Sequence, residues 1–270
     1  MFERLLLTGA AGGLGRALRG RLVELTRTLR LSDITDAPDA APGTEWMKCD
    51  LADGAAVHEL LRGVDAVVHL GAISTDAPFE PIMQANILGV FHLYEAARRH
   101  GVKRVVFASS NHTIGFYRQG ERIDANSPTR PDSFYGVSKV FGEELSRFYF
   151  DRYGVETVCL RIGSSFTEPK DRRMLVTWLS YEDLFELVRR SLVTPNVGHT
   201  IVYGASANSD SWWDNSKAAH LQWHPVDSSE QFRAKVEAQP PLAADDPAVR
   251  YQGGAYVKGG PYPSPWTDEP

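Results

Sequence analysis

The chain has 270 residues, with 29 lysines and arginines against 34 aspartates and glutamates, and a formal net charge of −5 at pH 7. This charge provides no basic excess to neutralise phosphates, which excludes nucleic acid as the main partner. Two cysteines are too few for a disulfide framework or a four-ligand zinc site, and no apolar stretch approaches the ~18 residues that span a bilayer, so we expect a cytoplasmic protein without a metal or a membrane partner.

Short apolar runs alternate with longer stretches of helical periodicity through residue 165, a pattern typical of βαβ units. Six strands are expected, at residues 5–7, 29–31, 45–49, 66–70, 104–110 and 156–161. Helices are expected at residues 14–25, around 57–61, at 79–100 and at 133–153. The pattern predicts an α/β protein with a doubly wound parallel sheet (a Rossmann fold), helices on both faces and the strand order 3-2-1-4-5-6.

The pattern changes after residue 165. We expect residues 1–165 to form one domain and residues 166–270 a small C-terminal cap packed on it. The capping box Ser180-Tyr181-Glu182-Asp183 predicts a helix that reaches Leu192. Two short helices are expected at residues 211–221 and 227–238. Seven of the 16 prolines fall in residues 240–270, so this tail is predicted to be extended and irregular.

A glycine-rich turn, Thr8-Gly9-Ala10-Ala11-Gly12-Gly13-Leu14-Gly15, joins the first strand to the first helix. Such a turn lets the backbone approach a pyrophosphate, whose charge the helix N-terminus stabilises. Asp33 follows at the end of the second strand, where a carboxylate can accept hydrogen bonds from the adenosine ribose. Because a carboxylate repels the 2′-phosphate of NADP, NAD is the expected cofactor. Asp50 follows the third strand and is expected either beside the adenine or in a plain turn.

Tyr135 and Lys139 lie four residues apart on one face of a predicted helix, and Ser110 ends the fifth strand at the ligand-binding edge of the sheet. A tyrosine titrates near pH ~10, so a phenolate base near neutral pH needs its pKa lowered by ~2–3 units, or ~3–4 kcal/mol. A lysine ammonium ~5 Å away supplies about 3 kcal/mol at an effective dielectric of ~20. The pair therefore has the right strength for a general base.

The T-G-x-x-G-x-x-G loop, the serine after the fifth strand and Y-x-x-x-K together resemble the short-chain dehydrogenase/reductase superfamily over residues 1–165. The resemblance implies that Tyr135 is the general base, that Lys139 binds the nicotinamide ribose and lowers the tyrosine pKa, and that Ser110 orients the substrate oxygen. Asn86 resembles an asparagine that kinks a helix and supports a proton relay. The residues expected to contact NAD are Gly9, Gly12, Gly13, Leu14, Gly15, Asp33, Asp50, Leu51, Leu70, Gly71, Ala72, Asn86, Ser109, Tyr135, Lys139 and Ile162.

Further local runs resemble the bacterial uronate dehydrogenase family over almost the whole chain, among them Ala108-Ser109-Ser110-Asn111-His112-Thr113-Ile114-Gly115 and Arg172-Arg173-Met174-Leu175. This resemblance implies NAD-dependent oxidation of the anomeric C1 hydroxyl of hexuronic acids, D-glucuronate and D-galacturonate, to aldarolactones. It makes Arg173 the carboxylate anchor, with Arg172 as its rival. The residues expected to contact the substrate are Ser74, Ser110, Asn111, His112, Tyr135, Ser164 and Arg173.

Two other functions stay open at this point. A nucleotide-sugar epimerase or dehydratase of the same superfamily would keep its NAD bound through turnover, and an NAD-sensing module would not catalyse a reaction. The intact tyrosine–lysine pair argues against a sensor, which has no need of a base. We also expect a homo-oligomer, because the helices at residues 79–100 and 133–153 form the dimer bundle in many relatives.

Overall fold

The computed structural model describes residues 1–36 and 41–262 and contains a seven-stranded sheet in the order β3-β2-β1-β4-β5-β7-β8, in which every neighbouring pair is parallel. The strands are β1 (Phe2–Thr8), β2 (Thr26–Asp33), β3 (Thr44–Lys48), β4 (Ala66–His69), β5 (Arg104–Ser110), β7 (Glu156–Ile162) and β8 (His199–Gly204). The predicted order 3-2-1-4-5-6 is confirmed. β8 extends this order by a strand that the sequence pattern does not predict, and it comes from the segment expected to form the cap.

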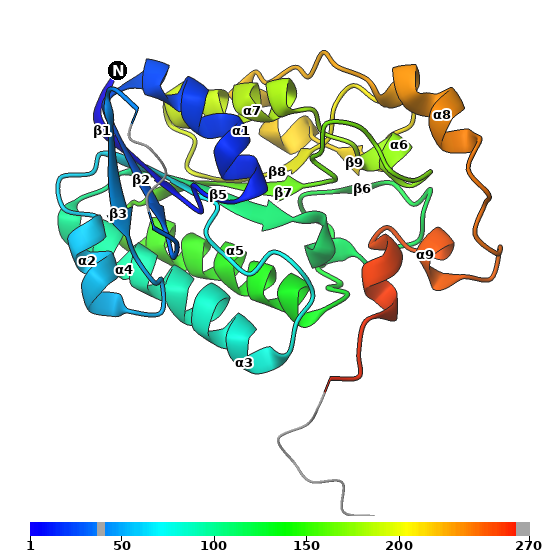
Figure 1. Cartoon of the computed structure of the whole chain (residues 1–270), viewed down its shortest axis with the longest axis horizontal. Coiled ribbons are helices and arrows are strands. Elements are labelled where there is room, and N and C mark those ends of the chain that lie inside the picture. The colour runs from blue at the N-terminus through cyan, green and yellow to red at the C-terminus, as the bar shows by residue number, and fades with distance from the viewer. Residues whose placement is uncertain (37–40, 263–270) are drawn as a thin grey trace, which may run out of the picture.

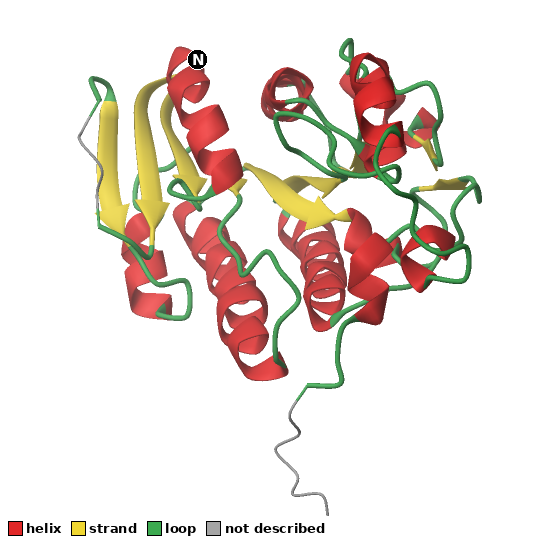
Figure 2. Ribbon diagram, turned by 45° about the vertical axis from the view of Figure 1, so that its right-hand side comes forward, coloured by secondary structure: helices red, strands yellow, loops and turns green. Residues whose placement is uncertain are grey.

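Helices cover both faces of the sheet, as Figures 1 and 2 show. One face carries α1 (Gly13–Leu22) and α7 (Tyr181–Val193), and the other carries α2 (Gly54–Leu60), α4 (Gly89–His100) and α5 (Phe134–Tyr153). The three consecutive leucines of β1 point alternately into the two helical layers. Leu5 and Leu7 pack under α1 and α7, whereas Leu6 packs on the side of α2 and α4. This alternation explains why a run of three leucines forms a strand buried on both faces.

The long helix predicted at residues 79–100 has a change of winding near its start. It comprises α3 (Phe79–Ile82), a π-helical segment (Met83–Leu88) and α4, and it ends at Gly101 in the left-handed region, with φ of 72°. A π-helical segment inserts an extra residue into the turn and is often found at functional sites. Asn86 lies in this segment.

The C-terminal segment departs most from the sequence prediction. Residues 211–221, predicted as a helix, contain β9 (Trp213–Asp214) and a 3₁₀ turn (Ser216–Leu221), and β9 pairs with β6 (Ile123–Asp124). The strand is favoured over the predicted helix because Trp213 stacks on Tyr203 and donates a hydrogen bond to the Gln252 side chain. Short helices at α6 (Met174–Thr177), Ser229–Phe232 and α8 (Arg233–Glu237) complete the cap.

The prediction of an irregular tail is wrong for part of residues 240–270. The described part contains α9 (Pro247–Arg250) and a 3₁₀ turn (Gly254–Lys258), whereas residues 263–270 lie outside the described residues. Asp246 caps α9 through its side chain, and Pro247 stands at the first helical position, where its missing N–H costs nothing. Residues 247–258 therefore contain regular structure where an irregular tail is predicted.

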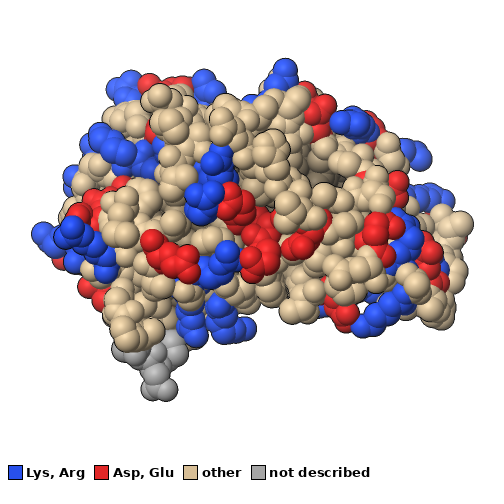
Figure 3. Space-filling view, turned by 90° about the horizontal axis from the view of Figure 1, so that it is seen from above, with Lys and Arg blue, Asp and Glu red and all other residues tan. Residues whose placement is uncertain are grey.

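The surface carries charges of both signs. Figure 3 shows acidic and basic side chains interspersed over the face seen from above, so this face offers no broad basic area to a polyanion. In residues 1–36 and 41–262, no helix has the length and apolarity needed to cross a bilayer, and no three His, Cys, Asp or Glu side chains gather as metal ligands.

Buried His69 makes the stability depend on pH. Its Nδ1 lies 2.7 Å from Thr8 Oγ1, and burial, with the nearby Lys139 charge, lowers the pKa of His69 to about 3. A histidine in the unfolded chain titrates near pH ~6.5. As the pH falls below this value, the unfolded state binds a proton and the folded state does not. We expect this group to lower the free energy of unfolding by up to about 1.4 kcal/mol for each pH unit below ~6.5. Urea unfolding of the wild type and His69→Gln at pH 7, 6 and 5 measures it; equal pH slopes for the two proteins would show that other groups are responsible.

Candidate active site

A pocket of about 940 Å³ opens at the carboxyl edge of the sheet, within the size range of ligand-binding pockets. The loops after β1, β2, β3, β4, β5 and β7 line it, together with the start of α5 and the tail residues Gly253, Ala255 and Tyr256. With one exception, Asn86, every residue predicted to contact cofactor or substrate lines this pocket. Ligand-binding side chains from distant parts of the sequence thus meet at one place.

The loop between β1 and α1 needs its glycines for three different reasons. Gly9 has φ of +70°, and a Cβ there would lie 2.7 Å from the Gly71 nitrogen. A Cβ at Gly15 would lie 2.2 Å from the Gly9 carbonyl oxygen, so the helix packs directly on the turn. A Cβ at Gly13 would meet nothing within 4 Å and would take up room in the pocket, at the start of α1. The loop therefore leaves backbone N–H groups at a helix N-terminus open to an anion, as a pyrophosphate requires.

Two carboxylates stand near this loop. Asp33 Oδ2 accepts a hydrogen bond from Ala11 N at 2.9 Å, and its Oδ1 accepts one from Ile34 N at 2.8 Å. These bonds fix the carboxylate against the glycine loop, where it fits an adenosine ribose with free hydroxyls. Asp50 lines the same pocket, and its Oδ1 accepts from Ala52 N at 2.9 Å. Asp50 therefore stabilises a turn while it faces the pocket. The site as a whole fits NAD.

Replacement of Asp33 should relax the choice between NAD and NADP. The Asp33→Ala variant removes the charge that repels a 2′-phosphate, so we expect the ratio of kcat/KM with NAD to kcat/KM with NADP to fall by at least roughly tenfold. Steady-state assays with both cofactors measure the ratio. Asp36→Ala is the matched control, because Asp36 is exposed and pairs with Lys48 at 2.8 Å. If the ratio changes equally in both variants, or in neither, ribose recognition lies elsewhere.

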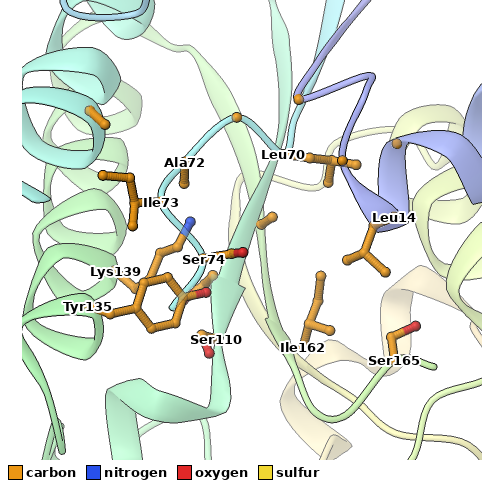
Figure 4. Close-up of a pocket in the computed structure, with 18 of the residues that line it drawn as sticks. Leu14, Leu70, Ala72, Ile73, Ser74, Ser110, Tyr135, Lys139, Ile162 and Ser165 are labelled. Carbon is orange, nitrogen blue, oxygen red and sulfur yellow. The ribbon is translucent and has the colours of Figure 1, made fainter. Parts of the chain in front are cut away.

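Tyr135 and Lys139 lie on the first turns of α5, whose N-terminus is capped by Ser133, the acceptor of a 3.0 Å hydrogen bond from Gly136 N. Figure 4 shows the two side chains with Ser110 and Ser74 along one wall of the pocket, across from Leu14, Ile162 and Ser165. Tyr135 is 7% exposed and Lys139 is 4% exposed. The Lys139 ammonium lies 5.5 Å from the centroid of the Tyr135 ring.

Burial changes the acidity of both groups. It raises the pKa of Tyr135 above its ordinary value, although the Ser110 hydroxyl acts in the opposite direction. Burial also lowers the pKa of Lys139, to about 8. In this structure burial thus outweighs the lowering of the tyrosine pKa that was expected from Lys139. A positive charge brought into the pocket would act on Tyr135 at short range and favour its phenolate form.

Asn86 lies behind the pocket wall. Its Oδ1 accepts from Ile73 N at 2.9 Å, and its Nδ2 donates to Ile73 O and to Ser138 Oγ, both at 3.0 Å. The side chain thereby ties the loop after β4 to α5. The structure does not bring Asn86 to the pocket surface, but it fixes Ile73, which lines the pocket.

The two neighbouring arginines have different surroundings. Arg172 is exposed, and its Nη2 donates to the carbonyl oxygens of Glu237 and Gln239. Arg173 is half-buried and lines the pocket, where its Nη1 donates to Ser164 Oγ at 3.2 Å. Burial lowers the pKa of Arg173, and within the described residues it forms no ion pair. A desolvated guanidinium without an anionic partner is suited to bind the carboxylate of a ligand.

His112 and two residues that the sequence did not single out form one more part of the pocket. His112 Nδ1 lies 2.8 Å from Asp132 Oδ2, and the Tyr256 ring stacks on the imidazole at a centroid distance of 3.7 Å. Because burial lowers the pKa of His112, we assign a neutral ring whose Nδ1–H donates to Asp132, which leaves Nε2 as an acceptor. Tyr256 comes from the tail, about 140 residues further along the chain, and no local pattern indicates its position.

Comparisons with known proteins agree with this geometry. The model of the NAD dependent epimerase/dehydratase family matches residues 5–180. A uronate dehydrogenase from Pseudomonas putida is 65% identical over 97% of this chain and 98% of its own. The crystal structure of a glucuronic acid dehydrogenase from Chromohalobacter salexigens is 53% identical with a TM-score of 0.95, covering 96% of this chain and 98% of that one. A tyrosine-to-alanine variant of uronate dehydrogenase from Agrobacterium tumefaciens, complexed with NAD, is 50% identical with a TM-score of 0.94 over the same shares.

Proposed function

This chain belongs to the NAD dependent epimerase/dehydratase family and, within it, to the uronate dehydrogenases, and we propose that it oxidises the anomeric C1 hydroxyl of hexuronic acids to aldarolactones. It is an NAD-dependent oxidoreductase that acts on uronic acids. The finer assignment to C1 rests on the chemistry of the pocket. One buried hydroxyl pair and one half-buried arginine suit a substrate with a hydroxyl at one end and a carboxylate at the other.

Tyr135 is the proposed base. It takes the proton of the C1 hydroxyl, Ser110 holds the same oxygen by a hydrogen bond, and the C1–O bond becomes the lactone carbonyl. NAD, when bound, supplies the acceptor for the hydride that leaves C1. Lys139 offsets the charge of the tyrosinate, since an ammonium ~5 Å away is worth about 3 kcal/mol at an effective dielectric of ~20. Removal of water from the pocket strengthens both interactions.

The observation that carries the substrate assignment is Arg173. Its guanidinium contacts Ser164, and it lines the same pocket as Tyr135 without an ionic partner among residues 1–36 and 41–262. A planar guanidinium binds a carboxylate through two parallel hydrogen bonds, which a lysine does not offer. We therefore assign Arg173, rather than Arg172, as the anchor of the uronate carboxylate. Ser74, Asn111 and His112 are assigned to the ring hydroxyls.

The direct test is spectroscopic. Purified protein mixed with NAD and D-glucuronate or D-galacturonate should produce NADH, seen as a rise in near-ultraviolet absorbance, and an aldarolactone in the product. No rise with either sugar would rule the proposal out. Protein that keeps NAD tightly bound and converts a nucleotide sugar without net NADH would instead be an epimerase or dehydratase.

The proposal also covers assembly and location. Apolar side chains stay exposed along α3, the π-helical segment, α4 and α5, namely Phe79, Leu88, Phe91, Phe134, Val137 and Phe148. A second copy would cover this face, so we propose a homo-oligomer in the cytoplasm, with residues 1–165 binding NAD and the parts of residues 166–270 outside α7 and β8 capping the substrate. Light scattering coupled to gel filtration measures the mass, and a monomer at micromolar concentration would contradict the first part.

A further inference from the structure

The tail docks beside the active site through its backbone. Gln119 N donates to Arg250 O at 2.8 Å, Gln252 N donates to Tyr117 O at 2.8 Å, and Gly253 N donates to Gly115 O at 2.9 Å. These bonds place residues 250–253 along the segment that follows the Ser110–Ile114 turn. Residues 250–253 are thus bonded to the segment that directly follows the turn beginning at Ser110.

Gln252 fixes this docking from within. It is fully buried, at 0% exposure, and its Nε2 donates to Arg118 O at 3.1 Å and to Glu121 O at 2.8 Å. Its Oε1 accepts from Trp213 Nε1 at 2.9 Å. Both amide N–H groups and the amide oxygen therefore have partners, which holds the side chain in one orientation. The backbone N–H groups of Gln252 and Gly253 are also bonded, so the direction of the main-chain carbonyl of Gln252 is fixed as well.

That carbonyl accepts a hydrogen bond from Arg173 Nε. The other two guanidinium nitrogens are also held, Nη1 by Ser164 Oγ at 3.2 Å and Nη2 by Asn111 Oδ1 at 2.6 Å, with the Asn111 amide turned so that its nitrogen donates to Ile162 O. A guanidinium has five N–H groups, so two remain, one on each terminal nitrogen. Two such groups are what a bidentate contact with a carboxylate uses.

The neighbouring Gly254 is shaped to the same arginine. It has φ of +63°, and a Cβ there would lie 2.7 Å from Arg173 Cδ. Both the turn and the close approach require glycine. The tail therefore packs against the stem of Arg173 as well as bonding its head.

We propose that Gln252 is a positioning residue for Arg173, because its anchored side chain aims its carbonyl at Nε and so orients the guanidinium for the substrate carboxylate. This inference rests on the proposed function, which makes Arg173 the carboxylate anchor. Gln252 is fully buried and does not line the pocket. Its proposed effect on substrate binding passes through Arg173.

A double-mutant cycle tests the inference on the full chain. Gln252→Met keeps the length of the side chain and removes its hydrogen bonds, and we expect it to lower kcat/KM for D-glucuronate about tenfold, through KM, while KM for NAD stays within twofold. On the Arg173→Met background the same change should have no further effect. Trp213→Phe removes one of the three bonds and should cause a smaller change in the same direction. This second variant provides the measurement if Gln252→Met does not fold, as judged by circular dichroism.

Gln119→Met is the matched control, because Gln119 Nε2 holds the tail through Ala248 O and Tyr251 O, both at 3.0 Å, without contact to Arg173. An equal loss in Gln119→Met, or a loss from Gln252→Met that persists on the Arg173→Met background, would overturn the inference. So would an unchanged KM for glucuronate in both Gln252→Met and Trp213→Phe. If the wild type itself formed no NADH with uronates, the proposed function would fail first and this inference with it.

Discussion

The Tyr135→Phe variant should bind NAD nearly as well as the wild type and lose turnover. The substitution removes one hydroxyl from a side chain that is 7% exposed and leaves its ring in place. General acid–base catalysis contributes roughly 10²- to 10⁴-fold, so kcat with D-glucuronate is expected to fall by about 10³-fold. Steady-state assays measure kcat. Fluorescence titration measures the dissociation constant of NAD, which should stay within about twofold of the wild-type value.

Tyr149→Phe provides the control for this experiment. Tyr149 lies on the same helix and is buried, and burial raises its pKa to about 12. Its hydroxyl donates to Glu95, outside the pocket. Its replacement should leave kcat unchanged. A Tyr135→Phe protein with activity near that of the wild type would mean that another group removes the C1 proton.

The pH dependence of wild-type activity is a second test of Tyr135 as the general base. A base acts in its deprotonated form, and burial raises the pKa of Tyr135. The value of kcat/KM should therefore increase with pH through the neutral and alkaline range, and decrease as the pH falls. The residual activity of Tyr135→Phe should lack this dependence.

Local sequence signals were sufficient for the core of this fold. Leu5, Leu6 and Leu7, followed by a glycine turn and an amphipathic helix, predict β1 and α1, because burial on both faces of a parallel strand requires a continuous apolar run. The strand order follows from the alternation of strands and helices. The same signals bring Tyr135, Lys139 and Ser110 to one edge of the sheet, where the structure places them in one pocket.

The missed features depend on distant contacts. β8 is a short edge strand, His199–Gly204, whose partner β7 lies about 40 residues earlier, and its register is set by that pairing. Tyr256 reaches His112 because the tail is bonded to residues 115–121, by backbone hydrogen bonds and by the side chains of Gln119 and Gln252. No spacing within residues 240–270 encodes such a contact, so a proline-rich composition pointed to an irregular tail instead.

Arg161 and Arg173 differ in the charge of their partners. Arg161 is 1% exposed and holds Glu143 through two hydrogen bonds, of 2.9 and 2.8 Å, in a network with Ser109 and Tyr203. Arg173 is held only by a carbonyl, a hydroxyl and an amide oxygen. Breaking a buried ion pair costs about 3–5 kcal/mol, because the remaining charge is left without its partner. Removal of a desolvated cation that lacks an ionic partner does not carry this cost.

Arg173→Met should therefore impair substrate binding without loss of stability. Loss of a charged partner from a carboxylate contact costs about 2–5 kcal/mol, so we expect kcat/KM for D-glucuronate to fall by roughly 30- to 4,000-fold, mainly through KM, with KM for NAD unchanged. The thermal midpoint should stay equal to that of the wild type or rise, since a half-buried charge is replaced by an apolar side chain of similar length. Steady-state kinetics and thermal unfolding of the same preparation measure both.

Two matched variants make the result specific. Arg172→Met removes the neighbouring exposed arginine and should leave the KM for glucuronate unchanged. Arg161→Met leaves Glu143 buried without its cation and should lower the thermal midpoint markedly, in contrast to Arg173→Met. A KM increase in Arg172→Met equal to that in Arg173→Met would reassign the carboxylate anchor. A large loss of thermal stability in Arg173→Met would show instead that this arginine is held for the fold, because its three hydrogen bonds would then outweigh the cost of desolvating its charge.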